Sequence, residues 1–339
     1  MFLKAKLYFL FTSLKFTLKI FVNSIKSYIF KSSVNKNDLD IAFIVPPQNS
    51  GWILLGIVKE IKSRLVEKKC KIVQLGDELP NAEIFFFMHY MFFYSYLLNN
   101  CLIKKKIILF VTHFESEKHK IPDFLILKLL NKASGLVCMN SSLETYLVSR
   151  GVNPMKTTTI IGGADHKRFK YVQSAKREFV GLSSAYYERK SPDKILQVIK
   201  NMPTYNFLLL GKNWENYSRY NQLLSLDNFT YLDIDYEDYP KYYSQMKVFL
   251  SLSTLEGGPI PLIEAMFCNA FPVVTDTGFA RDVINEGING FIVTVDCDVT
   301  TIVKKIVQAY EIECDVSSSV IDYSWDNFVL NINQHLNLR

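Results

Sequence analysis

The sequence alternates short apolar runs with segments of helical periodicity, and it does so in two successive series. Strands that alternate with helices in this way form a mostly parallel sheet covered on both faces. The alternation therefore predicts an α/β fold of two tandem doubly wound, Rossmann-like domains. The predicted strands lie at residues 39–45, 71–75, 84–88, 107–112 and 136–139 in the first series, and at 179–182, 205–210, 229–232, 248–252, 271–274 and 291–293 in the second.

A polar stretch near residues 165–176 separates the two series and marks the expected domain junction. A chain of 339 residues suits two domains of roughly 150 residues each. Ligands of doubly wound sheets bind outside the carboxyl ends of the strands, so we expect a ligand site in a central cleft that both domains face. The expected parts are an N-terminal helix with its linker at 1–37, a first domain at 38–170, a second domain at 171–320 and a C-terminal helix at 321–339 that can pack back on the first domain.

Composition and missing motifs exclude several classes of protein. The six cysteines form no C-x-x-C pair and no zinc-type spacing with histidine, so we expect a reduced cytosolic protein without a structural metal. The net charge of +6 is too small to indicate nucleic-acid binding by itself. The sequence has no phosphate-binding P-loop, no G-x-G-x-x-G after the first strand and no G-x-S-x-G elbow.

The first thirty residues are apolar, but lysines interrupt them too often for a membrane-spanning helix. At about 100° per residue, Lys4, Lys15, Lys19 and Lys26 fall on a face separate from a stripe of apolar residues. This pattern favours a helix in the membrane interface, with its apolar side toward lipid and its lysines toward anionic head groups. Packing on the protein's own surface and a secretory signal remain alternatives. Residues 31–37 are polar and predict a linker. The apolar stripe comprises Leu3, Leu7, Leu10, Leu14, Leu18, Phe21, Ile25 and Tyr28.

The most informative segment begins where the predicted strand at 248–252 ends. Glu256 is followed by Gly257 and Gly258, and a helix is expected to begin near Pro261. A helix N-terminus beside glycines offers unpaired amides and positive dipole character, so it can receive a diphosphate without a metal. Pro259 and Pro261 lack an N–H group. The expected donors are therefore the amides of Gly258, Ile260, Leu262 and Ile263.

A second carboxylate, Glu264, lies eight positions after Glu256 and inside the predicted helix. One acid before the helix can meet sugar hydroxyls on one side of a diphosphate, and one acid within it can accept hydrogen bonds from a ribose on the other side. Two glutamates at this spacing are weak evidence by themselves, because solvent exposure and helix capping explain an isolated pair more readily. The surrounding motifs distinguish these interpretations.

In these motifs the chain resembles the family 4 retaining nucleotide-sugar glycosyltransferases, whose GT-B fold has two facing Rossmann-like domains. The C-terminal half carries most of the resemblance, and the stretch from residue 38 to about residue 107 matches only in pattern. The matching motifs are T-H at 112–113, I-G-G-A-D-x-x-R-F at 161–169, E-G-G-P-I-P-L-I-E-A-M at 256–266, F-P-V-V-T-D at 271–276, G-I-N-G-F-I-V at 287–293 and S-W-D-x-F at 324–328.

The resemblance implies roles for the residues that match. Glu256 would contact the transferred sugar near its developing positive charge, and Glu264 would hold the ribose. Lys190 falls at the family's diphosphate-binding lysine, where a cation stabilises the leaving group. His113 falls at a histidine that faces the reacting centre. Lys190 with Arg189 can instead be a solvated pair at a helix start, and His113 an ordinary strand-end histidine.

The sequence departs from the family's pattern at several positions. Leu182 stands where an arginine usually follows the glycine that corresponds to Gly181, and Arg189 is the candidate substitute for donor binding. Asn269 replaces a common glycine in a turn. The glycine-rich loop after the first strand is reduced to residues 48–52, which leaves acceptor handling open.

The resemblance implies transfer of a sugar from a nucleoside diphosphate donor to an acceptor hydroxyl, with the anomeric configuration kept and no metal or cofactor needed. Together with the N-terminal helix, it suggests a lipid-linked acceptor in surface polysaccharide, lipopolysaccharide or glycolipid synthesis, at the inner face of the cytoplasmic membrane. Three alternatives stay open. A nucleotide-sugar epimerase would use Glu115 and Glu117 beside His113, a non-catalytic nucleotide-sugar-binding scaffold would explain Leu182, and a membrane adaptor would act through the N-terminal helix.

Overall fold

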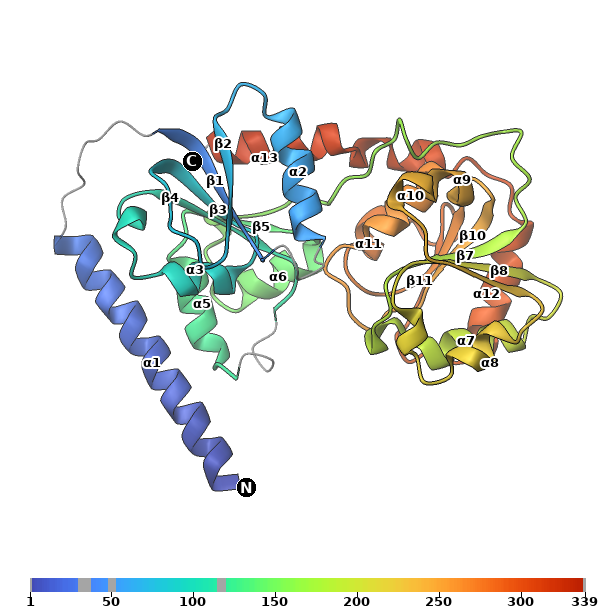
Figure 1. Cartoon of the computed structure of the whole chain (residues 1–339), viewed down its shortest axis with the longest axis horizontal. Coiled ribbons are helices and arrows are strands. Elements are labelled where there is room, and N and C mark those ends of the chain that lie inside the picture. Colours follow the sequence, from blue (N-terminus) through green and yellow to red (C-terminus); the bar gives the residue numbers. More distant parts are fainter. Residues whose placement is uncertain (1, 30–37, 48–52, 115–119, 338–339) are drawn as a thin grey trace. The chain divides into compact units, whose positions relative to one another are not determined.

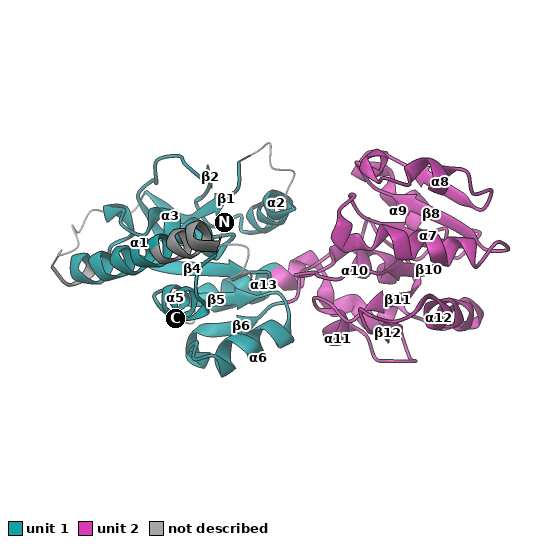
Figure 2. Ribbon diagram, turned by 90° about the horizontal axis from the view of Figure 1, so that it is seen from below, with its two compact units in different colours: residues 1–160, 329–339 teal, residues 161–328 magenta. Residues whose placement is uncertain are grey.

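The computed structural model describes residues 2–29, 38–47, 53–114 and 120–337. The chain divides into two compact units (Figure 2). Unit 1 comprises Met1–Ile160 and Val329–Arg339, and unit 2 comprises Ile161–Phe328. Each unit contains one parallel six-stranded sheet with helices between its strands (Figure 1). The predicted α/β fold of two tandem Rossmann-like units is confirmed. The unit boundaries lie at 160/161 and 328/329, where the sequence predicted 170/171 and 320/321.

The sheet of unit 1 has the strand order β2-β1-β3-β4-β5-β6. Its central strands are mostly apolar and buried, as expected of strands covered on both faces, with exceptions such as Asp40 near the start of β1 and Glu83 near the start of β3. The strands are β1 (Leu39–Val45), β2 (Cys70–Gln74), β3 (Ala82–Phe87), β4 (Lys106–Val111), β5 (Gly135–Cys138) and β6 (Thr157–Thr159). The sequence predicted the first five and missed β6. The connecting helices are α2 (Leu54–Arg64), α3 (Tyr90–Tyr96), η2 (Asn100–Leu102), α5 (Asp123–Asn131), α6 (Ser141–Ser149) and η3 (Pro154–Lys156).

The sheet of unit 2 has the order β12-β11-β10-β7-β8-β9, and all six of its strands were predicted. The strands are β7 (Phe179–Ser183), β8 (Asn206–Leu210), β9 (Phe229–Leu232), β10 (Met246–Ser251), β11 (Phe271–Thr275) and β12 (Phe291–Val293). The helices are η4 (Glu188–Lys190), α7 (Pro192–Lys200), η5 (Trp214–Asn216), α8 (Tyr220–Leu224), η6 (Tyr236–Asp238), α9 (Tyr239–Tyr243), α10 (Ile260–Phe267), α11 (Ala280–Val283), α12 (Val299–Glu311) and η7 (Ser317–Tyr323).

The strand order of unit 2 reverses direction between β7 and β10. The chain builds β7, β8 and β9 outward to one edge, and then builds β10, β11 and β12 outward to the other. The loops that leave the carboxyl ends of β7 and β10 therefore diverge. In open α/β sheets this topological switch point is where ligands bind.

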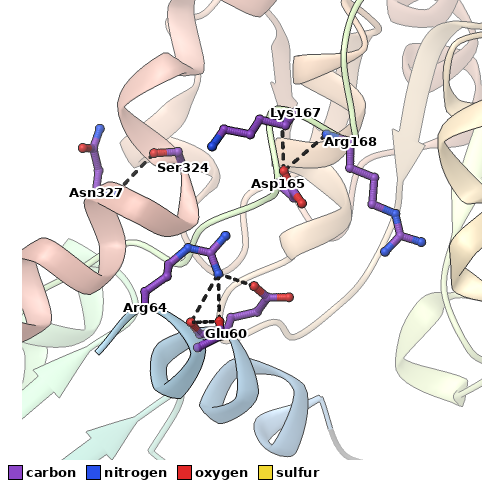
Figure 3. A network of polar contacts seen from close by, with 8 residues as sticks. Glu60, Arg64, Asp165, Lys167, Arg168, Ser324 and Asn327 are labelled. Carbon is purple, nitrogen blue, oxygen red and sulfur yellow. Dashed lines mark hydrogen bonds and ion pairs between the residues drawn. The ribbon is translucent and has the colours of Figure 1, made fainter. Parts of the chain in front are cut away.

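Two of the motifs in the resemblance lie against each other in unit 2. The amide of Ala164 donates to the carbonyl of Tyr323, and the amide of Trp325 donates back to the carbonyl of Ala164. Ser324 then starts helix α13 (Trp325–Asn337), because its hydroxyl accepts the amide of Asn327 at 3.3 Å (Figure 3). A side chain at Gly163 would come within 2.7 Å of the Trp325 backbone, so the approach of the two motifs requires glycine.

The last residues of α13 belong to unit 1 and pack on its sheet. The ammonium of Lys106, at the start of β4, donates to the carbonyl of Leu336. A Cβ atom at Gly135, the first residue of β5, would lie 2.7 Å from the ring of His335, so the small residue there makes room for the helix.

Helix α1 (Phe2–Ile29) belongs to unit 1 and packs beside α3 and α5 on the rest of that unit (Figures 1 and 2). Phe16 is fully buried, and its ring stacks on Tyr94 with the centroids 4.2 Å apart. The expectation that the lysines face outward is wrong for Lys19 and Lys26, because both donate to backbone carbonyls of unit 1. Among the described residues, no helix combines the length and apolarity needed to cross a bilayer.

Three predictions fall on parts of the chain outside the described residues. These are the linker at 31–37, the shortened loop at 48–52, and the epimerase candidates Glu115 and Glu117.

Candidate functional site

Lys190 and Glu256 meet at the switch point of unit 2. Lys190 ends η4, in the loop after β7, and Glu256 lies in the loop after β10. The ammonium of Lys190 forms a hydrogen-bonded ion pair with Oε1 of Glu256, and Nη1 of Arg189 lies 3.0 Å from Oε2. The structure therefore brings three of the predicted site residues together, with both oxygens of one carboxylate held by cations.

Backbone contacts fix the two loops to each other. The amide of Thr254 donates to the carbonyl of Arg189 at 2.8 Å, and the Arg189 guanidinium donates to the carbonyl of Leu255 at 2.7 Å. Ser191, directly after Lys190, has the left-handed backbone conformation at φ 55°. Such conformations are costly for residues other than glycine and cluster at functional sites. The cations are thus presented by a loop that the neighbouring loop holds in place.

The carboxyl group of Glu256 is ionised in this setting. Its side chain is 10% exposed, and this burial by itself would raise its pKa. The charges of Lys190 and Arg189, with hydrogen bonds from Lys190 and Ser253, outweigh burial and hold the pKa below the ordinary value. A largely buried negative charge therefore sits at the carboxyl end of β10.

Helix α10 begins at Ile260, directly after Gly257-Gly258-Pro259, close to the predicted start. Two of the amides expected to receive a diphosphate are already engaged within the loop. Ile260 donates to the carbonyl of Gly258 at 3.0 Å, and Leu262 donates to the carbonyl of Pro259 at 2.8 Å. A phosphate bound here would have to replace these carbonyls. The other two expected donors are the amides of Gly258 and Ile263.

A third loop, between β11 and α11, approaches Glu256 and Pro259 at Gly278. A Cβ atom on Gly278 would lie 2.8 Å from the ring of Pro259 and 3.2 Å from Cβ of Glu256. Gly278 also has a positive φ of 58°, which glycine adopts most easily. Loops from three adjacent strands thus converge around Glu256.

Glu264 lies inside α10 and is buried, with 2% of its surface exposed. Oε1 accepts a hydrogen bond from the hydroxyl of Tyr236, and Oε2 accepts one from Tyr243 at 3.1 Å. Burial raises the pKa of Glu264 to about 7, although both tyrosines and the charge of Arg168 act in the opposite direction. The predicted ribose ligand is thus already paired with two phenols. The sequence analysis named neither of them.

Arg168 is a further residue that the sequence analysis left without a role. Oδ1 of Asp165 accepts the amides of Lys167 and Arg168, and this turn directs the Arg168 side chain (Figure 3). The Arg168 guanidinium donates to the carbonyl of Tyr236 at 2.6 Å and lies 4.6 Å from its ring centre. The R-F pair in the motif at 161–169 was the available signal, since Phe169 packs against Tyr236 as well.

Leu182, which stands in place of the family's usual arginine, is a core residue of β7 and is only 3% exposed. Arg189 reaches the carboxylate of Glu256 instead. A positive charge is therefore delivered to this site from the loop rather than from the strand.

The loop after β8 also contacts strand β9 and the segment after β7. The hydroxyl of Tyr231 donates to the carbonyl of Gly211 at 3.1 Å, and the indole of the buried Trp214 donates to the carbonyl of Ser184 at 2.8 Å. A Cβ atom at Gly211 would lie 1.8 Å from the same Ser184 oxygen. Glycine at position 211 is therefore required for this close approach.

His113 lies in unit 1, after β4, with its Nδ1 atom 2.9 Å from the hydroxyl of Thr112. The other predicted site residues lie in unit 2. The role of His113 at the reacting centre stays a prediction. Among the described residues, no group of three or more His, Cys, Asp or Glu side chains is arranged to hold a metal ion.

Residues 164–324 match the family model described as "Glycosyl transferases group 1". The matched residues include Lys190, Glu256, Glu264 and the start of α10, whereas His113 lies outside them. None of the curated proteins compared matches the sequence.

Solved glycosyltransferase structures share the fold of most of the chain. HepE of Anabaena, in complex with UDP and glucose, has a TM-score of 0.70 at 15% identity, and the match covers 89% of this chain and 100% of HepE. Sucrose-phosphate synthase from Thermosynechococcus elongatus has a TM-score of 0.72 at 14% identity, with 88% and 98% covered. The lipopolysaccharide outer core galactosyltransferase WaaB has a TM-score of 0.66 at 13% identity, with 88% and 99% covered. At these identities the likeness establishes the GT-B fold alone.

Proposed function

We propose that the protein is a retaining glycosyltransferase of the family 4 type, which transfers a sugar from a nucleoside diphosphate sugar to an acceptor hydroxyl. The observation that carries the proposal is the ionised Glu256, held by Lys190 and Arg189 beside the start of α10. Its support is the domain match at 164–324, together with neighbours whose names include UDP, UDP-glucose and galactosyltransferase.

Lys190 and Arg189 would stabilise the leaving group. When the bond between C1 of the sugar and the diphosphate breaks, negative charge grows on the departing oxygen, and fixed cations in a largely buried site stabilise that charge. The start of α10 adds dipole character of the same sign. In this arrangement the protein's own cations act on the diphosphate and no metal is needed.

Glu256 would act on the sugar by charge and position rather than as a nucleophile. Its carboxylate is already held by two cations, which lowers its nucleophilicity. The acceptor oxygen would bond to C1 on the face that the diphosphate leaves, and the departing phosphate oxygen would take the acceptor proton. Glu256 would then stabilise the positive charge that develops on the ring.

Glu264 would accept hydrogen bonds from the ribose of the donor. In the structure, the hydroxyl of Tyr236 occupies one of its oxygens, and Tyr236 is 46% exposed. Donor binding would therefore exchange the phenol of Tyr236 for ribose hydroxyls, while the buried Tyr243 keeps the second oxygen in place.

The acceptor would be a lipid-linked saccharide, and the protein would work as a peripheral protein at the inner face of the cytoplasmic membrane. The support is helix α1, whose outward side is apolar, together with the likeness to a lipopolysaccharide galactosyltransferase. The products would then belong to surface polysaccharide, lipopolysaccharide or glycolipid.

A thermal-shift panel of nucleotide sugars tests donor binding before any acceptor is known. We expect at least one nucleoside diphosphate sugar to raise the unfolding temperature of the full chain. The shift should vanish in Lys190→Ala and persist in Lys200→Ala, which removes the same charge from an exposed position at the end of α7. A shift that survives Lys190→Ala would contradict the assigned site. Formation of an epimer without acceptor would favour an epimerase instead.

A further inference from the structure

The outward side of α1 is a continuous apolar stripe. Its residues are spaced three or four positions apart, so they share one side of the helix. Their exposed fractions are high for large apolar side chains, at 73% for Phe11, 66% for Leu14 and 61% for Phe21. We call this set the α1 stripe. It comprises Phe11, Leu14, Leu18, Phe21 and Ile25.

The opposite side of α1 is fixed to unit 1 by polar side chains. Lys19 donates to the carbonyls of Tyr94 and Ser95, and Asn23 donates to the carbonyl of Leu97 at 2.5 Å. Lys26 donates to the carbonyl of Leu98 at 3.0 Å and to the side chain of Asn100.

These acceptors follow from the way α3 ends. The last carbonyls of a helix lack intrahelical partners and carry partial negative charge. Lys19 donates to two carbonyls of the last turn of α3, and Lys26 donates to a carbonyl just past the helix. The buried ring of Phe16 adds an apolar contact by stacking on Tyr94. The rotation of α1 about its own axis is thus set by unit 1, and it is this rotation that turns the α1 stripe outward.

Either a second copy of α1 or a lipid surface could cover an exposed apolar stripe on a helix. The charges on α1 distinguish these two partners. A second copy of α1 would pair stripe to stripe as a coiled coil, in which acidic and basic residues flank the seam. The chain has no acidic residue before Asp38, whereas α1 carries three further lysines, Lys4, Lys6 and Lys15, besides the inward-bound Lys19 and Lys26. Two copies would therefore repel each other, while an anionic lipid surface would attract the helix.

The polar residues that flank the α1 stripe are also compatible with a lipid surface. The hydroxyls of Thr17 and Ser24 donate to carbonyls of α1 itself, so they bring no unpaired donor to an apolar boundary. Lys15 is exposed at the other edge, where a head-group phosphate can meet it.

We propose that α1 docks the protein on an anionic membrane by inserting the α1 stripe among the acyl chains, while Lys19, Asn23 and Lys26 fasten the helix to unit 1. The inference rests on the membrane association proposed above, but not on sugar transfer. It assigns membrane affinity to the apolar side chains and gives two of the lysines an internal role.

Sedimentation of the full chain with vesicles tests this docking. The probes are vesicles of phosphatidylcholine alone and of phosphatidylcholine mixed with phosphatidylglycerol. We expect binding to the mixed vesicles, and a loss of about tenfold or more in Leu14→Glu/Phe21→Glu. The matched control is Val66→Glu/Ile288→Glu, which places the same charges on apolar residues that are 83% and 71% exposed outside α1. The control should bind within about twofold of the unchanged protein.

Light scattering without lipid and a nucleotide thermal shift complete the test. Equal vesicle binding by both double variants would overturn the proposal. So would a dimer that the α1 variant converts to a monomer, because the stripe would then join two copies. Nucleotide-sugar binding is scored separately on the same proteins. Vesicle binding without a nucleotide-sugar thermal shift would contradict the proposed enzyme and support the docking surface. A thermal shift without vesicle binding would support the enzyme and contradict the docking surface.

Discussion

Lys190 and Glu256 form an ion pair between two loops that leave neighbouring parallel strands, although the residues are 66 positions apart in the chain. The pair lies where the strand order of unit 2 reverses, which is the place that doubly wound sheets offer to ligands. A diphosphate that approaches Lys190 therefore meets a cation whose charge Glu256 already balances. Binding would redistribute that charge without creating a buried unpaired ion.

Glu256→Gln should separate donor binding from transfer. The amide keeps the shape of the side chain but removes the negative charge, so Lys190 and Arg189 become more available to a diphosphate. We expect UDP to bind at least as tightly as to the unchanged protein, while transfer slows by about 10²- to 10³-fold. Calorimetry with UDP and a transfer assay give the two values. Glu311→Gln, at the exposed end of α12, is the control, and full transfer by Glu256→Gln would refute the role.

Glu264 should make unit 2 less stable as the pH rises. Its pKa is raised from 4.5 to about 7, mainly by burial, so between these values the folded chain binds more protons than the unfolded chain. The free energy of unfolding must then fall as the pH increases across this window, by roughly 3 kcal/mol in total. Glu264→Gln removes this term, so its stability relative to the unchanged protein should improve between pH 5 and pH 8.

Glu256 supplies an internal control of opposite sign. Its pKa is lowered because Lys190 and Arg189 outweigh burial, so it stabilises the folded state above the unfolded pKa near 4.5 and loses that contribution as the pH falls further. Glu256→Gln should therefore be destabilising near neutral pH and less so in acid. Chemical unfolding of both variants from about pH 3 to pH 8 covers the window of each carboxyl group and checks the two trends. A flat difference curve for Glu264→Gln would contradict its raised pKa.

Gly211→Ala should destabilise unit 2 strongly. The added methyl group would meet the backbone oxygen of Ser184 at 1.8 Å, which forces the loops after β7 and β8 apart. We expect a loss of about 3 kcal/mol, measured from the thermal unfolding of unit 2. Gly287→Ala is the matched control, because Gly287 has a positive φ of 78° but open space around it. It should cost only about 1 kcal/mol of backbone strain. Equal losses in the two variants would show that the close approach does not matter.

Phe16→Ala should loosen α1 from unit 1. The ring is fully buried against Tyr94, and truncating a buried phenylalanine costs about 3–5 kcal/mol. Because α1 is an outer helix, local opening should absorb this loss, and hydrogen exchange of its amides should quicken by on the order of a hundredfold. Leu18→Ala, on the exposed side of the same helix, should leave exchange almost unchanged. If both variants exchange alike, the buried and exposed sides are wrongly assigned.

Eleven of the twelve strands in the described part of the chain were predicted, because strands of a parallel sheet are buried on both faces and appear as mostly apolar runs. The sequence analysis missed β6, whose three threonines carry no apolar signal. Helical spacing also identified which residues of α1 share a side, but not what each side contacts. That depends on carbonyls at the end of α3, 75 residues away from Lys19 in the sequence.

The same distinction holds at the site. The motif at 256–266 located Glu256, Glu264 and the start of α10, since these are close in sequence. The hydroxyls of Tyr236 and Tyr243 contact Glu264, although these residues lie 28 and 21 positions away in the sequence. No local sequence pattern predicts these contacts. These distant hydroxyls oppose the rise in pKa that burial causes, so the motif alone does not reveal the protonation of Glu264.

A crystal structure of the full chain with the nucleotide sugar selected by the thermal-shift panel tests the central claim most directly. The account predicts a diphosphate bound to the ammonium of Lys190 and to amides at the start of α10, with a ribose hydroxyl on Glu264 in place of the phenol of Tyr236. A nucleotide bound elsewhere, with the Lys190–Glu256 pair and the Tyr236–Glu264 bond unchanged, would contradict it.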